Sequence, residues 1–158
     1  MYKINVEGQK RLKHVKNEFI KSITIEPIIY SFIIYLVYLS IGTKVLIVFF
    51  LILAATVVYF IVFGIYAPIR LMKRQNRTIS EIDFENNEVL IKTDKVHWLK
   101  PQQIKVKINS LTSKPGKFKW YGIKEKEGLS IFFCDIELFL VNEYFDEYED
   151  IKELLTEK

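Results

Sequence analysis

The side chains best suited to catalysis or metal binding are few in this chain and far apart. It has two histidines, His14 and His97, and a single cysteine, Cys134. The sequence contains no His-x-x-x-His pair, no nucleophile elbow and no glycine-rich phosphate loop. It therefore predicts a non-enzymatic protein with no catalytic residue, no metal and no cofactor. A small enzyme or proton-linked transporter that uses Glu26 or His97 is the least supported alternative.

Cys134 lacks a second cysteine with which it could form an intrachain disulfide, and this suits a reducing cytoplasmic compartment. Its neighbours Phe132, Phe133 and Ile136 are apolar. Because unpaired cysteines are usually buried like small hydrophobic residues, we expect Cys134 inside a strand rather than as a reactive thiol.

Glu26 is an ionisable residue at the edge of an apolar segment, where charge is costly and often marks a functional site. Pro27 follows it, as is typical of the first turn of a helix. A carboxylate in that turn favours the helix dipole and can reach headgroup water. We therefore expect an interfacial Glu26, and an intramembrane functional site is the alternative.

Two apolar runs, residues 28–41 and 45–65, are separated only by Gly42, Thr43 and Lys44. At about 1.5 Å of rise per residue, a helix needs about 20 apolar residues to cross a hydrocarbon core of about 30 Å. The second run meets that length without an ionisable side chain, and the first meets it when residues 22–27 are included. The sequence therefore predicts a two-helix transmembrane hairpin over residues 22–69.

Basic residues flank this hairpin on both sides, whereas the loop between its helices has only Lys44. An arm of residues 1–21, predicted to be a basic cytoplasmic segment, carries Lys3, Lys10, Arg11, Lys13, Lys16 and Lys21. A second group, here called the basic cluster, follows the hairpin and consists of Arg70, Lys73, Arg74 and Arg77. The positive-inside tendency predicts a multi-pass protein of the inner (cytoplasmic) membrane with both termini in the cytoplasm. We expect the basic cluster to set this topology and also to face anionic lipid headgroups.

Residues 70–158 are charged and rich in turns, and their apolar residues alternate with polar ones as in half-buried strands. Asn86 and Asn87 tolerate positive φ and predict the turn of a β-hairpin, and residues 104–108 alternate strictly. The sequence Lys-Pro-Gly-Lys predicts a turn at residues 114–117. Residues 129–141 are expected to form two strands that fold back near Cys134 and Asp135.

The C-terminal segment changes to a helical period. Its apolar positions are Tyr148, Ile151, Leu154 and Leu155. Asp146 with Glu149 resembles a capping box at the start of this helix. The predicted fold class is an α+β membrane protein, in which the transmembrane α-hairpin precedes a small antiparallel β-sheet or partial barrel capped by a C-terminal helix.

The β domain also carries a local pattern with a known counterpart. The pattern consists of Trp120 and Ile123, a charged turn at residues 124–127, two strands, the aromatic Phe145 and a short acidic helix. In this order of parts the chain resembles the bacterial YcxB-like family, which joins a two-span membrane hairpin to a pleckstrin-homology-like (PH-like) domain. Asn142 and Glu143 stand where that family typically has a proline and a base, so no anion site is expected there. The resemblance transfers no catalytic residue.

Together these patterns favour an integral membrane protein whose cytoplasmic PH-like domain, residues 70–158, is a protein-binding or scaffold module near anionic lipid. The expected partners are anionic headgroups, a protein of unknown identity and, as an open alternative, a second copy of the chain. Nucleic acid is not expected, because the formal net charge is only +4 and no RNA-binding motif is present. The alternative function is that of an accessory or immunity-type inner-membrane protein whose hairpin regulates or blocks a membrane-acting effector.

Overall fold

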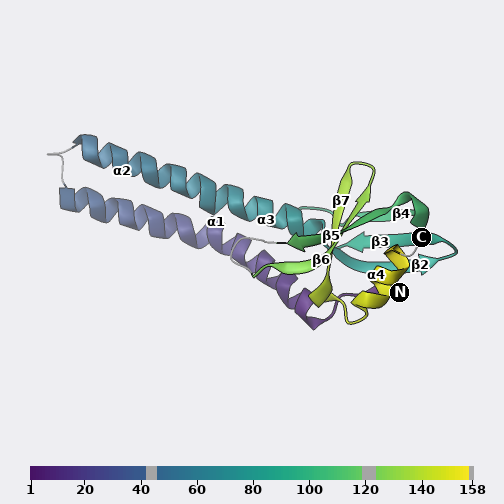
Figure 1. Cartoon of the computed structure of the whole chain (residues 1–158). Coiled ribbons are helices and arrows are strands. Elements are labelled where there is room, and N and C mark those ends of the chain that lie inside the picture. The colour runs from purple at the N-terminus through teal and green to yellow at the C-terminus, as the bar shows by residue number, and fades with distance from the viewer. Residues whose placement is uncertain (42–45, 119–123, 157–158) are drawn as a thin grey trace. The chain divides into compact units, whose positions relative to one another are not determined.

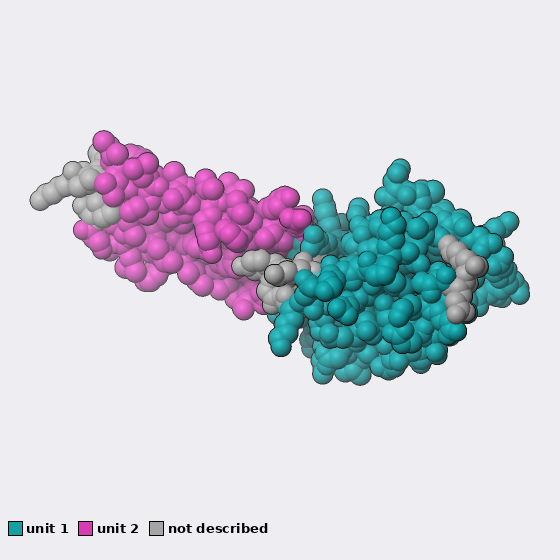
Figure 2. Space-filling view, viewed as in Figure 1, with its two compact units in different colours: residues 1–16, 71–158 teal, residues 17–70 magenta. Residues whose placement is uncertain are grey.

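The computed structural model describes residues 1–41, 46–118 and 124–156, and divides the chain into two compact units. The β unit comprises residues 1–16 and 71–158, and the hairpin unit comprises residues 17–70 (Figure 2). The sequence predicts that the arm ends at residue 21 and that the hairpin ends at residue 69. Three predicted features, the loop at residues 42–44 and the motif residues Trp120 and Ile123, lie outside the described residues.

The helices of the hairpin unit are drawn in Figure 1, and the first and last of them continue into the β unit. They are α1 (Val6–Ile41), α2 (Leu46–Tyr59), the π-helix η2 (Phe60–Tyr66) and α3 (Ala67–Asn76). Two stretches, Val6–Ser40 and Ile47–Asn76, are long and apolar enough to cross a membrane, and only 6% of the most apolar window of each is buried. The expectation of two span-length apolar helices is therefore confirmed.

The first residues of the chain fold onto the β unit. Strand β1 (Tyr2–Lys3) pairs with β2 (Ile79–Glu85), and the Ile4 N–H donates to the Ser80 carbonyl at 3.0 Å. Helix α1 begins directly afterwards. The predicted arm is thus built from a short strand and the first turns of a long helix.

The first sheet is antiparallel in the order β1-β2-β3-β4, with β3 at Glu88–Thr93 and β4 at Gln103–Lys107. The predicted turn between β2 and β3 is confirmed, since Asn86 and Asn87 have φ values of 46° and 66°. Alternation is also confirmed: Val89 and Ile91 of β3 are buried, and the apolar residues of β4 are less exposed than its lysines.

The second sheet has the order β5-β6-β7, with β5 at Thr112–Phe118, β6 at Lys126–Phe133 and β7 at Ile136–Val141. The predicted turn at residues 114–117 is wrong, because those residues lie inside β5. An edge strand tolerates Pro115, whose missing N–H need not join the ladder. The next residue, Gly116, faces Gly128 in register, and an added Cβ at Gly128 would lie 2.0 Å from the Leu140 carbonyl oxygen. Pro115 and Gly116 therefore continue an extended strand rather than reverse the chain.

The two strands predicted within residues 129–141 are confirmed as β6 and β7, but the expectation for Cys134 is wrong. Cys134 is exposed and occupies the turn between these strands, with a φ of 50°. A two-residue connection must place its side chains at the hairpin tip, so the flanking phenylalanines do not bury it.

The two sheets are joined near the end of α3, where the Phe139 N–H of β7 donates to the Arg77 carbonyl at 3.0 Å. The 3₁₀ turn η3 (Ile108–Ser110) connects β4 to β5, and η4 (Asn142–Tyr144) leads from β7 to α4 (Tyr148–Thr156), which closes the fold. Helix α4 confirms the predicted amphipathic helix, because its Tyr148, Ile151 and Leu155 are buried. The β unit is therefore an α+β fold of antiparallel sheets.

Candidate functional site

The basic cluster lies along one face of α3 and its C-terminal end. Arg70, Lys73, Arg74 and Arg77 follow the spacing i, i+3, i+4 and i+7, which places side chains on one side of a helix. Arg70, Lys73 and Arg77 are exposed and Arg74 is half-buried. Among the described residues no ion pair involves Arg70, Lys73 or Arg77. Their charges are therefore available to an external anion.

The opposite face of α3 fixes this surface in place. Its buried residues are Leu71, Met72, Gln75 and Asn76. Met72 is fully buried, and the Thr78 hydroxyl donates to the Arg74 carbonyl at 3.2 Å, just beyond the end of the helix. Burial of one face and hydrogen bonding at its end thus hold the basic face outward.

Asn76 binds α3 to the segment between β3 and β4, which we call the 94–100 loop. Its side-chain amide donates to the Asp94 carbonyl at 3.1 Å and to the Lys100 carbonyl at 2.9 Å. Asn76 is 7% exposed, so both hydrogen bonds are largely shielded from water. One buried amide therefore holds the two ends of the loop together.

A second anchor of the loop is His97. The His97 Nε2 lies 3.1 Å from the Lys16 carbonyl oxygen of α1, and only a protonated Nε2 can donate to that acceptor. His97 is half-buried with a φ of 51°, and it forms with Trp98 a tight turn closed by hydrogen bonds between Val96 and Leu99. His97 therefore lies in a turn, and its ring nitrogen serves as a structural donor.

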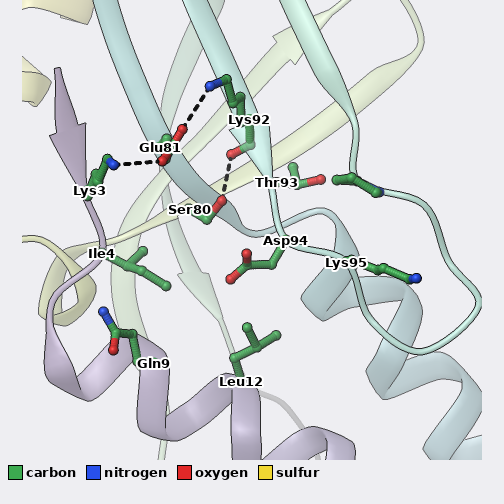
Figure 3. A pocket seen from close by; sticks show the side chains of 11 residues that line it. Lys3, Ile4, Gln9, Leu12, Ser80, Glu81, Lys92, Thr93, Asp94 and Lys95 are labelled. Atoms are coloured by element: carbon green, nitrogen blue, oxygen red, sulfur yellow. Dashed lines mark hydrogen bonds and ion pairs between the residues drawn. The ribbon is translucent and has the colours of Figure 1, made fainter.

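Figure 3 shows a pocket of about 570 Å³ beside this loop, between the start of the chain and the β2–β3 edge. Glu81 lies at its rim and pairs with Lys92 at 3.0 Å and with Lys3 at 3.3 Å. The hydrogen bond from Lys92, followed by that from Lys3, lowers the pKa of Glu81 although burial opposes the shift. Burial raises the pKa of Asp94, which projects into the pocket, and the charge of Lys16 opposes that shift.

The pocket lies where the start of the chain packs against β2 and β3. Glu81 at its rim is paired with Lys3 and Lys92, and no nucleophile with an adjacent base lines it. Within residues 1–41, 46–118 and 124–156 there is no group of three or more His, Cys, Asp or Glu side chains that could hold a metal ion. The residues that line the pocket therefore do not form a recognisable catalytic arrangement.

Asn5 links the start of α1 to the segment that follows β7, and it was not identified from the sequence. Its Oδ1 accepts from the N–H groups of Glu7 and Gly8 at 3.0 and 3.1 Å, so it is the N-cap of α1. Its Nδ2 donates to the Glu143 carbonyl at 3.1 Å and to the Asp146 carboxylate at 2.9 Å. An asparagine directly before a helix with an acidic first turn is the signal that could have identified the cap.

Phe145, the described member of the domain motif, is a core residue at 3% exposure. Beside it, burial raises the pKa of Tyr144 to about 12, although the nearby Arg11 charge acts in the opposite direction. Glu143, at the corner where the resemblance would place a base, is ion-paired with Lys126. This corner is consequently a packed, charge-neutral support for the start of α1.

The helix start predicted at Glu26 and Pro27 is wrong, because both residues lie inside α1, which begins at Val6. Within the hairpin unit, Glu26 faces the π-helix. Its carboxylate would lie 3.4 Å from a Cβ added at Gly64, a buried residue of η2. One turn further along α1, the Tyr30 ring meets the rings of Tyr59 and Phe60 edge-on, at centroid distances of 5.8 Å each. The close approach that a side chain at Gly64 would meet is to the Phe60 ring, at 2.7 Å, and the Glu26 carboxylate lies beside it at ordinary contact distance.

Comparison of the chain with family models, with curated proteins and with solved structures gives no match.

Proposed function

We propose that the chain is an inner-membrane protein with two spans and cytoplasmic termini, and that its β unit is a PH-like protein-binding or scaffold module working beside anionic lipid. The protein acts without catalysis in this proposal. The observation that carries it is the outward basic face of α3, which follows directly on the second apolar helix.

Electrostatics supports a lipid partner for this face. A lysine or arginine close to an anionic membrane surface gains about 1 kcal/mol, so four bases give an upper bound of about 4 kcal/mol. Arg70, Lys73 and Arg77 have no competing ion pair among the described residues. The basic face therefore fits a layer of anionic headgroups better than it fits a structural role.

The hairpin unit supports a lipid environment in a second way. Most of the large exposed hydrophobic side chains of the chain belong to α1, α2 and η2, with examples such as Ile47, Leu51 and Val58. In water this would be an unusually large apolar surface for a soluble protein. In a bilayer the same side chains face hydrocarbon.

The PH-like assignment, and with it the YcxB-like family, draws support from the architecture of the β unit. Two antiparallel sheets and a C-terminal helix that packs its apolar face inward are the parts the resemblance implies. The exposed outer faces of these sheets offer a surface for a protein partner, and the two spans would hold that surface next to the bilayer.

The basic face is tested through Cys134, which is the only cysteine of the chain and is exposed. A donor dye on Cys134 and an acceptor on lipid headgroups report how closely the β unit approaches the membrane. We expect energy transfer to be greater in vesicles that contain anionic lipid than in neutral ones. In Lys73→Gln/Arg77→Gln this difference should shrink clearly, since the two bases together contribute about 2 kcal/mol.

Lys105→Gln/Lys107→Gln is the matched control. These two lysines are equally exposed but lie on β4, toward the end that adjoins the Asn87 turn rather than α3. The control should keep the dependence on anionic lipid. Unchanged dependence in the Lys73/Arg77 variant, with Arg70 and Arg74 still setting topology, would contradict the proposed lipid contact.

A second candidate function is favoured by the contact between Glu26 and Gly64. Carboxylates within spans and π-helical turns are both frequent at functional sites. If the hairpin itself is the working part, the chain is an accessory or immunity-type protein that regulates or blocks a membrane-acting effector.

Replacing residues 22–66 by an unrelated two-span hairpin separates the two candidates. A protein partner cross-linked in membranes and bound by the β unit should be retained in this chimaera. Loss of that partner, together with loss of the phenotype and despite normal membrane levels, would favour the hairpin as the working part.

A further inference from the structure

The 94–100 loop carries the most exposed aromatic side chain of the described β unit. Trp98 is 60% exposed, and within residues 71–118 and 124–156 the next most exposed large hydrophobic side chain is Leu154 of α4, at 43%. Tryptophan is enriched at the membrane–water interface because its ring is apolar and its N–H is polar. The exposure of the Trp98 ring therefore suits a position at such an interface.

The loop is attached to both segments of the chain that lead into the hairpin. His97 binds the Lys16 carbonyl of α1, and Asn76 at the end of α3 binds the carbonyls of Asp94 and Lys100. Lys16 is the last residue of the β unit on α1, and residues 17–21 alone separate it from the predicted span. A helical segment of that length covers only about 8 Å.

The loop is also held in one conformation. Val96 is fully buried, the Val96–Leu99 hydrogen bonds close the turn, and the His97 ring lies 6.1 Å from the indole of Trp98. The backbone of Thr93 and the Thr93 hydroxyl both bond to Gln102, which closes the base of the loop. Trp98 is therefore presented on a rigid support, so little conformational entropy would be lost when it binds.

Two exposed lysines flank the tryptophan in this loop, Lys95 and Lys100. Neither takes part in an ion pair among the described residues. An aromatic ring between two free bases complements a layer of anionic headgroups above hydrocarbon, in which the ring lies at the boundary and the bases lie among the phosphates.

We propose that the 94–100 loop is a membrane-interface anchor, with Trp98 inserted at the headgroup level and with Lys95 and Lys100 on anionic phospholipid. This inference rests on the proposed membrane location of the hairpin, and it assigns a lipid site that is separate from the basic cluster. The anchor gives the β unit a third attachment to the bilayer, beside α1 and α3. Three attachments fix the orientation of a rigid body, so the anchor would determine which sheet surface faces the cytoplasm.

The test uses the full chain in vesicles, with Trp120→Phe so that Trp98 is the only tryptophan. Lipids brominated on the acyl chain quench indole within the membrane, and acrylamide quenches indole in water. Trp98 should lose emission in brominated vesicles, show a blue-shifted maximum and be protected from acrylamide. In Lys95→Gln/Lys100→Gln the equilibrium for insertion of the loop should fall roughly 25-fold, because each base contributes a factor of about five.

A tryptophan at an exposed position away from the loop provides the control, using Leu154→Trp in a chain that also carries Trp98→Phe and Trp120→Phe. Its emission should respond to acrylamide and not to brominated lipid. If Trp98 behaves in the same way while the protein withstands an alkaline wash of the vesicles, the anchor is wrong and the hairpin stands. Release of the protein by that wash would overturn the membrane location, and the anchor with it.

Discussion

Arginine at both Leu51 and Val58 should prevent stable insertion of the hairpin. These residues lie on α2, seven positions apart on one face, and are 66% and 60% exposed. If lipid surrounds that face, each arginine near the middle of a span costs about 2.5–3.5 kcal/mol, so the pair should disfavour insertion by roughly 5 kcal/mol or more. The equilibrium constant for insertion of Leu51→Arg/Val58→Arg should fall by more than about 1,000-fold, and the amount recovered in alkaline-washed membranes should fall with it.

Tyr66→Arg is the control for this pair, because Tyr66 is 61% exposed at the C-terminal end of η2. A base there lies near the predicted interface and should insert normally. The double variant is informative because arginine at an equally exposed position in water is nearly harmless. Normal folding and unchanged fractionation of the double variant would show that water, not hydrocarbon, covers α2.

Asn5→Ala should cause a large loss of stability in the β unit. The substitution removes the N-cap of α1, which is typically worth about 0.5–2 kcal/mol, and two hydrogen bonds donated to Glu143 and Asp146, worth about 1 kcal/mol each. We expect the free energy of unfolding to fall by about 3 kcal/mol and the Tm by roughly 10–15 °C. Denaturant titration in detergent, followed by near-ultraviolet circular dichroism, measures this change.

Asn5→Ser separates the two contributions, since serine can still cap the helix but cannot make both amide hydrogen bonds. Its loss should be intermediate between those of the unmodified chain and the alanine variant. Asn109→Ala, at an exposed asparagine of η3, should be neutral. An effect of Asn5→Ala below about 0.5 kcal/mol would mean that residues 1–16 are not an integral part of the β unit.

Several elements were predictable because their signals are local. The Asn86–Asn87 turn, the two strands β6 and β7 and helix α4 each follow from a few neighbouring residues, as do the two long apolar helices. The errors at Pro115 and Cys134 have one origin. The sequence shows only the local propensity of a residue for a turn or a strand. Whether the residue lies in a strand or in a turn depends on which strands pair with each other.

The site was only partly predictable for a related reason. The basic cluster could be recognised from its charges, and its i, i+3, i+4, i+7 spacing already implied one helical face. The anchors of the 94–100 loop could not be recognised from the sequence, because His97 and Lys16 are 81 positions apart in the chain. Asn5 likewise acts on residues more than a hundred positions away, and no local pattern reports such a contact.

The most direct measurement is fractionation of the full-length chain after cell lysis without detergent. The chain should sediment with membranes at high speed, stay with them through an alkaline wash and enter the supernatant only when detergent is added. A chain that is found in the supernatant without detergent would contradict the membrane hairpin on which the proposed function rests.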